Sequence, residues 1–528
     1  MAEKSKKKKL SKLIIARNVI YFLLLLLFNF ALFIKFKFHN VGFEQLLFTL
    51  TNTEGANFDV VYQGILFVLL TTLGELLLIF GIKKLFKFLK MRIVVNVGIK
   101  SKKINKIFSF DIFKITKLKQ VCLFIIIFIL GIYIPIDMID FTNYFRAQKV
   151  KTSFFEDYYV NPVDVDIKFE GDKKNLIYIY VESLESSNVS IKNGGVVEKS
   201  YVPNLEKIAL DNINFSNTSK IGGAVQVSNT TWTVAGLIAQ NAGVPLKIPI
   251  SANSYKEYSS SLPGAYGLGE VLEKNGYKNY FMLGSDSSYG GRKDFFLQHG
   301  NYEIFDHPKA IEEKYIPNDY DVWWGYEDKK LFEFSKKKLL EISKNDEPFN
   351  FTILTADTHF TDGYMDSSCK EVFDEAYANS FYCSDSKIGE FIRWIKKQDF
   401  YNDTAIVITG DHLTMQEDFY EEDVDDKRYI YNAFINSSVT TNNSKNRTFT
   451  AFDLYPTTLA AMGATIDGNK LGLGVNLFSD EKTLIEMFGK EELNKQLVGK
   501  SEYYNQELLG DSYYEMLDDV EDKSKLDE

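Results

Sequence analysis

The sequence predicts an α/β protein in which transmembrane helices at the N-terminus precede an extracytoplasmic, doubly wound parallel sheet. Three long apolar runs lie before residue 140, and beyond about residue 165 short apolar runs of strand length alternate with helical patterns. Strands and helices that alternate in this way form a parallel sheet covered on both faces. We expect a membrane domain over residues 1–140, a linker over 141–165, a folded α/β domain over 166–480 and an acidic C-terminal tail over 481–528.

The three apolar runs cover roughly residues 19–34, 60–82 and 121–136. Each run approaches or reaches the ~20 residues that a helix needs to cross a bilayer. Lys35 and Lys37 follow the first run where a cleavable signal peptide would carry small residues, so we expect this run to remain as an anchor. Glu75 lies inside the second run, where a carboxylate either has a function or packs against another span.

The distribution of charge predicts the orientation of these helices. Lys4 to Lys9 precede the first run, and about a dozen Lys and Arg residues lie between the second and third runs. Because such basic segments stay in the cytoplasm, the region after the third run faces outward from the cytoplasmic (inner) membrane. The formal net charge of −10 argues against nucleic acid as a partner, since a nucleic-acid-binding protein must neutralise phosphates.

Two of the three cysteines fall in the part of the chain that is predicted to be exported. Cys122 lies in the third apolar run, whereas Cys369 and Cys383 lie in the α/β domain. An oxidising compartment favours a disulfide bond between that pair, with two unpaired thiols as the alternative.

Polar side chains follow several of the predicted strands. The strands are expected at residues 176–181, 280–283, 349–354 and 405–409. Glu182 directly follows the first strand, His359 lies shortly after the third, and Asp411 and His412 follow the fourth. Ligands of open parallel sheets bind beyond the carboxyl ends of the strands, so we expect these side chains to converge on one crevice.

A threonine-rich segment, Asn229–Thr233, leads into a predicted helix over residues 234–240. A hydroxyl at a helix start is ordinarily an N-cap, but the same position can bind a phosphate. Beside a metal ion, Thr230 would be an activated nucleophile. Two carboxylates, one imidazole and an alkoxide form a mostly oxygen ligand set, which suits one Mn²⁺ or Zn²⁺ ion and also admits Mg²⁺.

Four segments of the chain carry a resemblance to a known family. They are NLIYIYVESLESS at 175–187, NTTWTVAGLIAQNAGVPL at 229–246, TADTHFTDG at 355–363 and ITGDHLTM at 408–415. In this order they resemble the phosphoglycerol transferases of osmoregulated periplasmic glucans, which belong with the lipoteichoic acid synthases in the alkaline-phosphatase and sulfatase superfamily. The resemblance covers about residues 170–480 and implies a sulfatase-like (alkaline-phosphatase-like) catalytic domain.

The resemblance also implies roles for individual residues. The implied metal ligands are Glu182, Thr230, Asp411 and His412, with Thr230 as the nucleophile. The implied substrate contacts are His359 and Arg292. The family pattern of a threonine, a variable residue and Trp-Thr selects Thr230, although Thr231 is adjacent and leaves the register open.

By this resemblance the chain is a metal-dependent phosphotransferase that moves phosphoglycerol from phosphatidylglycerol to a glycan hydroxyl through a phospho-threonine intermediate. Its partners would be the donor lipid, a glycan acceptor and the lipid bilayer. One alternative is a phosphoethanolamine transferase that acts on a glycan or a lipid A-type acceptor, and another is a catalytically inactive glycan-binding protein of the same fold. The Cys-x-Pro-x-Arg motif that sulfate-ester hydrolysis requires does not occur in the chain.

Overall fold

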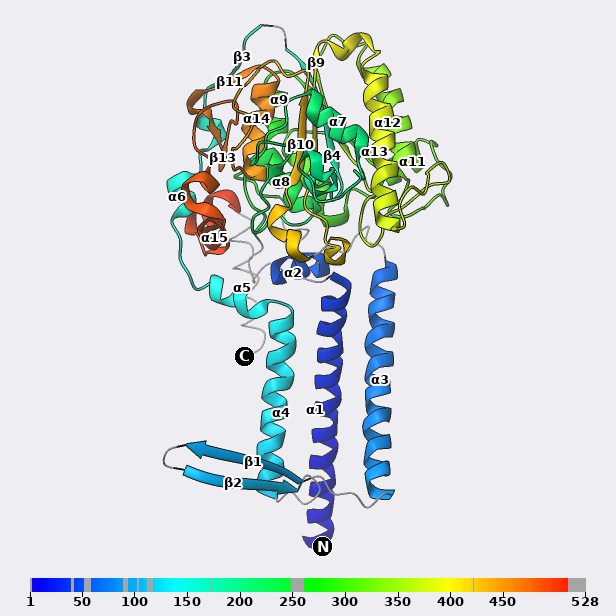
Figure 1. Cartoon of the computed structure of the whole chain (residues 1–528), viewed down its shortest axis with the longest axis vertical. Coiled ribbons are helices and arrows are strands. Elements are labelled where there is room, and N and C mark those ends of the chain that lie inside the picture. Colours follow the sequence, from blue (N-terminus) through cyan, green and yellow to red (C-terminus); the bar gives the residue numbers. More distant parts are fainter. Residues whose placement is uncertain are drawn as a thin grey trace. The chain divides into compact units, whose positions relative to one another are not determined.

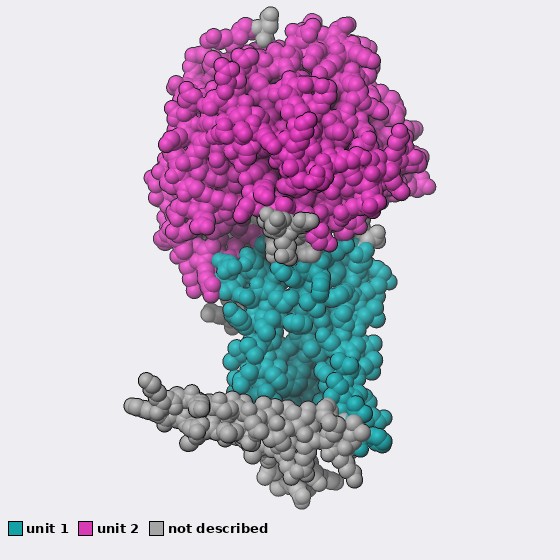
Figure 2. Space-filling view, in the orientation of Figure 1, with its two compact units in different colours: residues 1–43, 57–143 teal, residues 44–56, 144–528 magenta. Residues whose placement is uncertain are grey.

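A computed structural model describes residues 2–38, 42–51, 58–88, 94–101, 104–111, 117–171, 173–247, 261–420 and 422–510. The chain forms two units, one of residues 1–43 and 57–143 and the other of residues 44–56 and 144–528 (Figure 2).

The first unit contains the three apolar helices that the sequence predicts. They are α1 (Ala2–Phe38), α3 (Phe58–Phe88) and α4 (Lys117–Met138). In the sequence between α3 and α4, β1 (Val94–Ser101) pairs with β2 (Ile104–Asp111). Stretches of 27, 26 and 18 residues in these helices are long and apolar enough to cross a membrane. Asn29 of α1 donates hydrogen bonds of 2.9 Å to both Thr72 and Glu75 of α3, so Glu75 packs against another apolar helix.

Among the described residues, the second unit contains a seven-stranded sheet with the order β5-β10-β9-β4-β8-β6-β7. The strands are β4 (Asn175–Val181), β5 (Gly223–Ala224), β6 (Lys278–Leu283), β7 (Glu303–Phe305), β8 (Phe349–Leu354), β9 (Thr404–Gly410) and β10 (Ile430–Ile435). The strands from β9 to β7 are parallel, and β10 and β5 continue the sheet in antiparallel pairing. The four predicted strands correspond to β4, β6, β8 and β9.

Both faces of the sheet are buried, because alternate residues of each strand enter different cores. In β4, Tyr178 and Tyr180 pack in one apolar cluster, whereas Ile177 and Ile179 pack in another. The first cluster includes side chains of α8 (Thr233–Ala242) and α14 (Leu454–Ala461), and the second includes side chains of α7 (Pro203–Asp211), α12 (Asp328–Ile342) and α13 (Ala376–Ile395) (Figure 1). This arrangement is the doubly wound α/β fold that the sequence predicts.

Smaller elements complete the described part of the chain. The remaining α-helices among the described residues are α2 (Phe43–Thr51), α5 (Phe141–Ala147), α6 (Phe154–Tyr158), α9 (Leu268–Lys274), α10 (Arg292–Gln298), α11 (His307–Glu312) and α15 (Leu484–Val498), and short 3-10 and π-helical turns lie between the elements. The antiparallel pairs are β3 (Ile167–Phe169) with β11 (Ala464–Ile466) and β12 (Lys470–Leu471) with β13 (Gly474–Val475).

The core of the second unit extends on both sides of the predicted domain at residues 166–480. Phe154 and Phe155, in the segment expected to be a linker, are buried in the first cluster. Leu493 and Leu497 of α15, in the segment expected to be a tail, are buried in the same cluster. These apolar residues stand among charged neighbours, so they form no run in the sequence. Residues 511–528 of the expected tail lie outside the described residues.

Candidate active site

The strand register brings the predicted metal ligands together. β4 and β9 are parallel neighbours with Val181 opposite Gly410. Glu182 and Asp411 therefore leave the sheet side by side, and His412 follows directly. Ligand atoms of these three side chains lie within 4.8 Å of one another, and all three residues are buried. The predicted convergence of Glu182, Asp411 and His412 is thus present in the structure.

The hydrogen bonds around this cluster leave ligand atoms available. Oδ1 of Asp411 accepts from the backbone N–H groups of Ser183 and His412, both at 2.8 Å. Oδ2 is buried without a hydrogen-bond partner and lies 3.5 Å from Nε2 of His412. Nδ1 of His412 lies 2.7 Å from the carbonyl oxygen of Leu413, and donation there leaves the Nε2 lone pair free to bind a metal.

The charges of the cluster favour a cation. Burial raises the pKa of Asp411, the negative charge of Glu182 adds to this effect, and the value reaches about 7. Burial lowers the pKa of His412, but Asp411 and Glu182 outweigh it and raise that pKa to about 10. Nε2 of His412 lies 3.3 Å from Oε1 of Glu182. A divalent ion would neutralise both carboxylates and leave the imidazole as a neutral ligand, so these residues fit a metal site.

The threonine segment approaches the cluster, but the three threonines differ in their contacts. α8 begins at Thr233, with Trp232 as its N-cap, so Thr230 precedes the helix and does not cap it. The hydroxyl of Thr233 donates to Oε2 of Glu182 at 3.2 Å and lies 3.4 Å from Nε2 of His412. The hydroxyl of Thr230 is fully buried and donates to the carbonyl oxygen of Val227 at 2.8 Å.

Sequence reasoning missed Thr233. The sequence signal for Thr233 was the cluster of threonines in this segment. That pattern does not tell which of the hydroxyl groups points to the carboxylates. Thr231 is partly exposed. The assignment of Thr230 as ligand and nucleophile remains a prediction.

Helix α8 is held directly against the end of β9. A Cβ atom at Gly236 would lie 2.1 Å from the carbonyl oxygen of Asp411, so the two backbones are in contact at this glycine. Gln240 donates from Nε2 to the carbonyl oxygen of Gly410 at 2.9 Å and accepts from Thr409 at 2.8 Å. These contacts fix the threonine segment relative to the predicted metal ligands.

Two predicted substrate contacts lie around the cluster. Burial lowers the pKa of His359, and the charges of Glu182, His412 and Arg292 also act on it. Burial lowers the pKa of Arg292, while Glu182 is among the groups that raise it. Both residues therefore share the electrostatic environment of Glu182, although among the described residues no hydrogen bond joins either of them to the three-residue cluster.

Arg292 is positioned by an unusual turn. Gly290 and Gly291 have φ values of 68° and 69°, a conformation that favours glycine, and α10 begins at the next residue. The guanidinium donates from Nε to the carbonyl oxygen of Tyr289 at 2.9 Å and from Nη2 to that of Asp286 at 2.6 Å. Within the described part of the chain, Nη1 of Arg292 and Nε2 of His359 have no hydrogen-bond partner.

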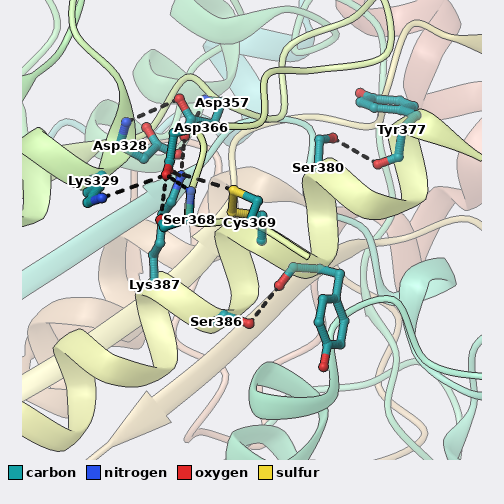
Figure 3. The surroundings of a disulfide bond; sticks show 12 residues. Asp328, Lys329, Asp357, Asp366, Ser368, Cys369, Tyr377, Ser380, Ser386 and Lys387 are labelled. Atoms are coloured by element: carbon teal, nitrogen blue, oxygen red, sulfur yellow. Dashed lines mark hydrogen bonds and ion pairs between the residues drawn. A yellow bond between two sulfur atoms is a disulfide. The ribbon is translucent and has the colours of Figure 1, made fainter. Parts of the chain in front are cut away.

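A disulfide bond and a buried ion-pair network hold the segment that carries His359. The predicted bridge is confirmed: Cys369 and Cys383 are joined, with their Cα atoms 5.4 Å apart (Figure 3). Lys387 lies 2.6 Å from Asp357 and 2.8 Å from Asp366. Asp328 accepts from the backbone N–H groups of residues 356 and 357 at 2.8 and 3.2 Å. These contacts restrain the chain immediately before His359.

Comparison with known proteins gives relatives of part of this chain. Phosphoglycerol transferase I from Escherichia coli O6:K15:H31 (strain 536 / UPEC) is 34% identical over 252 residues, which are 46% of this chain and 31% of that protein. Phosphoglycerol transferase I from Shigella boydii serotype 18 (strain CDC 3083-94 / BS512) matches with the same identity and coverage. The match spans about a third of the length of these relatives.

Two solved structures are also similar. The lipoteichoic acid synthase LtaP from Listeria monocytogenes has 19% identity and a TM-score of 0.46, over 60% of this chain and 79% of that chain. The lipooligosaccharide phosphoethanolamine transferase A (EptA) from Neisseria meningitidis has 12% identity and a TM-score of 0.47, over 85% of this chain and 84% of that chain.

A family model described as Sulfatase matches residues 174–464, more than half of the 528 residues. The predicted resemblance is therefore confirmed, and the chain belongs to the Sulfatase family.

Proposed function

We propose that this chain is a membrane-anchored phosphotransferase that moves phosphoglycerol from phosphatidylglycerol to a glycan hydroxyl through a phospho-threonine intermediate. The observation that carries the proposal is the buried cluster of Glu182, Asp411 and His412, with one carboxylate oxygen unpartnered and a threonine segment against it. The relatives named phosphoglycerol transferase I, at 34% identity, support the choice of the transferred group.

Glu182, Asp411 and His412 would hold one divalent ion, with Thr230 as the proposed fourth ligand. The mostly oxygen ligand set favours Mn²⁺ or Zn²⁺ and also admits Mg²⁺. When bound, the ion would stabilise negative charge on the phosphoryl oxygens and lower the pKa of a neighbouring hydroxyl.

In the first step, the hydroxyl oxygen of Thr230 forms a bond to the phosphorus of phosphatidylglycerol, and the bond from phosphorus to the diacylglycerol oxygen breaks. The proton of Thr230 ends on the departing diacylglycerol. In the second step, a glycan hydroxyl oxygen forms a bond to the phosphorus, the bond from phosphorus to the Thr230 oxygen breaks, and the proton of the glycan hydroxyl returns to Thr230. The Thr230 hydroxyl must first leave the carbonyl oxygen of Val227, because that contact occupies its proton in the structure.

The remaining residues of the site would bind and orient the phosphoryl group. Arg292 has a nitrogen without a partner among the described residues and is suited to phosphoryl oxygens. Nδ1 of His359 donates to the carbonyl oxygen of Phe360 at 2.5 Å, so its Nε2 would donate to a phosphoryl oxygen when the imidazole is protonated. Thr233 would keep Glu182 in place. The disulfide bond and Lys387 would hold the segment of His359 in one conformation.

The proposed location is the cytoplasmic (inner) membrane, with the apolar helices as multiple spans and the second unit outside the cytoplasm. Three helices are long and apolar enough for this role. A donor that resides in the same membrane would then be available to an enzyme anchored there.

The test is to incubate the full-length protein in detergent with Mn²⁺ and phosphatidylglycerol, and to measure diacylglycerol release and the mass of the peptide that contains Thr230. A phosphoglycerol adduct on that peptide supports the proposal. A parallel reaction with phosphatidylethanolamine separates the two donors, and turnover of that lipid alone would replace phosphoglycerol with phosphoethanolamine. Absence of bound metal and of turnover with both lipids would indicate a catalytically inactive binding protein.

A further inference from the structure

Two consecutive tryptophans lie near the candidate active site, and both are partly exposed. Trp323 and Trp324 belong to a tight turn closed by hydrogen bonds between Val322 and Gly325, of 2.7 and 3.1 Å. Large aromatic side chains that stay partly exposed beside a polar site are typical of ligand-binding positions.

The turn is rigid because it is anchored to the sheet. Tyr326 donates its backbone N–H to the carbonyl oxygen of Gly284, directly after β6, at 2.9 Å. Gly325 has a φ of 133°, and a Cβ atom there would lie 2.2 Å from the same carbonyl oxygen. Both tryptophans therefore belong to a turn whose backbone is anchored at the carboxyl end of the sheet, where the predicted metal ligands also lie.

The two indoles make different contacts. Trp323 donates its Nε1–H to the carbonyl oxygen of Ala356 at 3.1 Å, so its polar group is used inside the protein. The ring of Trp324 lies 4.7 Å from that of His359 and 5.7 Å from that of Tyr289, measured between centroids. The Nε1–H of Trp324 has no hydrogen-bond partner among the residues that the structure describes.

Tyr289 connects Trp324 to the second predicted phosphoryl contact. The guanidinium carbon of Arg292 lies 5.7 Å from the Tyr289 ring centroid. Trp324 thus lies directly against the ring of His359, and the ring of Tyr289 lies between Trp324 and Arg292. In the proposed site, a group bound to the indole N–H would lie beside the two residues proposed to hold the phosphoryl group.

We propose that Trp324 is a substrate-binding residue whose indole N–H binds a hydroxylated carbon chain attached to the phosphoryl group. The inference rests on the proposed function, in which the phosphorus atom carries the glycerol of the donor headgroup before transfer and a sugar of the acceptor after it. The hydroxyl oxygens of a polyol can accept a hydrogen bond from the indole N–H, and its C–H groups can pack against the indole ring. The polyol is either the glycerol of the donor headgroup or a sugar of the acceptor, which share this chemistry.

The test compares Trp324→Phe with Trp323→Phe, because each variant keeps an aromatic ring and loses one N–H group. Full-length protein with Mn²⁺ is titrated by calorimetry with glycerol 1-phosphate, with methyl β-D-glucopyranoside and with inorganic phosphate. We expect Trp324→Phe to bind one of the two polyols about tenfold more weakly, the order of effect of one hydrogen bond, and to bind phosphate as the wild type does. Trp323→Phe should bind all three ligands normally.

A loss confined to glycerol 1-phosphate assigns Trp324 to the donor headgroup, and a loss confined to the glucoside assigns it to the acceptor sugar. Unchanged binding of both polyols by Trp324→Phe overturns the inference. Equal losses in the two variants, or a loss of phosphate affinity in Trp324→Phe, also overturn it, since they indicate a structural role for the turn. Diacylglycerol release by the wild type is measured separately, so failure of the proposed function is recognised independently.

Discussion

The hydroxyl of Thr233 donates a hydrogen bond of 3.2 Å to Oε2 of Glu182. This contact joins the first residue of α8 to the residue that follows β4. Ser183 donates to the other oxygen, Oε1, at 2.8 Å, so both oxygens of the Glu182 carboxylate are held by hydroxyl groups. A metal ligand with both oxygens oriented in this way is fixed before the ion arrives.

Thr233→Val should weaken metal binding because it removes the hydroxyl with little change in volume. We expect the affinity for Mn²⁺ to fall by about tenfold, at the lower end of the effect of losing a group that orients a ligand. Calorimetric titration of the full-length protein measures this change. Thr233→Ser keeps the hydroxyl and should bind nearly as the wild type does, and wild-type affinity in Thr233→Val would refute the positioning role.

Thr230→Ala should abolish transfer if Thr230 is the nucleophile. The side chain is not an N-cap, and its loss removes one hydrogen bond to a carbonyl, so stability should fall by only about 1 kcal/mol. Diacylglycerol release should nevertheless fall by several orders of magnitude, since the covalent route is lost.

Alanine variants of the neighbouring threonines serve as controls for that experiment. If Thr231→Ala is inactive and Thr230→Ala is active, the family register is wrong by one residue. If Thr233→Ala alone is inactive with metal still bound, the hydroxyl of Thr233 is the nucleophile. Activity in all three variants would exclude a threonine intermediate.

The Cys369–Cys383 bond closes a short loop, with a sequence separation of 14. In the chain-entropy model a loop of this length stabilises the fold by about 3 kcal/mol. We expect Cys369→Ser to lower the free energy of unfolding by about that amount, while Cys122→Ser, which removes an exposed free thiol, should have little effect. Peptide mapping without reductant should recover the linked pair, and two alkylatable thiols in exported protein would contradict it.

Lys387→Met should destabilise the fold because two acidic side chains with little exposure lose their cation. The side chains of Asp357 and Asp366 are 1% and 9% exposed. Removing one partner of such a buried pair costs about 3 kcal/mol or more. Lys329→Met is the matched control, because Lys329 is 55% exposed and lies 3.8 Å from Asp366; it should change stability by less than about 1 kcal/mol.

The effect of Lys387→Met should also depend on pH. Burial raises the pKa of Asp357, and Lys387 opposes that shift. In the variant the folded-state pKa should rise further above the unfolded value, so the penalty is largest at neutral pH and falls as Asp357 is protonated. Chemical denaturation at pH 7 and pH 5 should show a smaller difference from the wild type at pH 5, and an equal difference would contradict this explanation.

The proposed topology can be tested with fusions to a reporter that is active only outside the cytoplasm. The reporter should be active when fused after residue 150 and inactive when fused near Lys102, because the basic segment before the third span is expected to stay in the cytoplasm. The opposite pattern would place the second unit in the cytoplasm and exclude transfer to an exported glycan.

Much of the sheet and the metal cluster could be predicted because they depend on simple rules. β4 and β9 are apolar along almost their whole length, and parallel strands end at the same edge of a sheet, so Glu182 and Asp411 were expected at one edge. That β4 and β9 are direct neighbours is known from the structure. The choice between Thr230 and Thr233 could not be made from the sequence, since it depends on where α8 begins and which way each hydroxyl turns. The contact between Trp324 and His359 joins two loops and leaves no periodic pattern.

Gly236 has a consequence for how this site can vary. Its backbone rests on the carbonyl oxygen of Asp411 with no room for a methyl group. The spacing between the threonine segment and a predicted metal ligand is therefore a distance between two backbones, which no change of side-chain rotamer can adjust. Even the smallest added side chain at this position would push α8 away from Asp411 and so change this spacing.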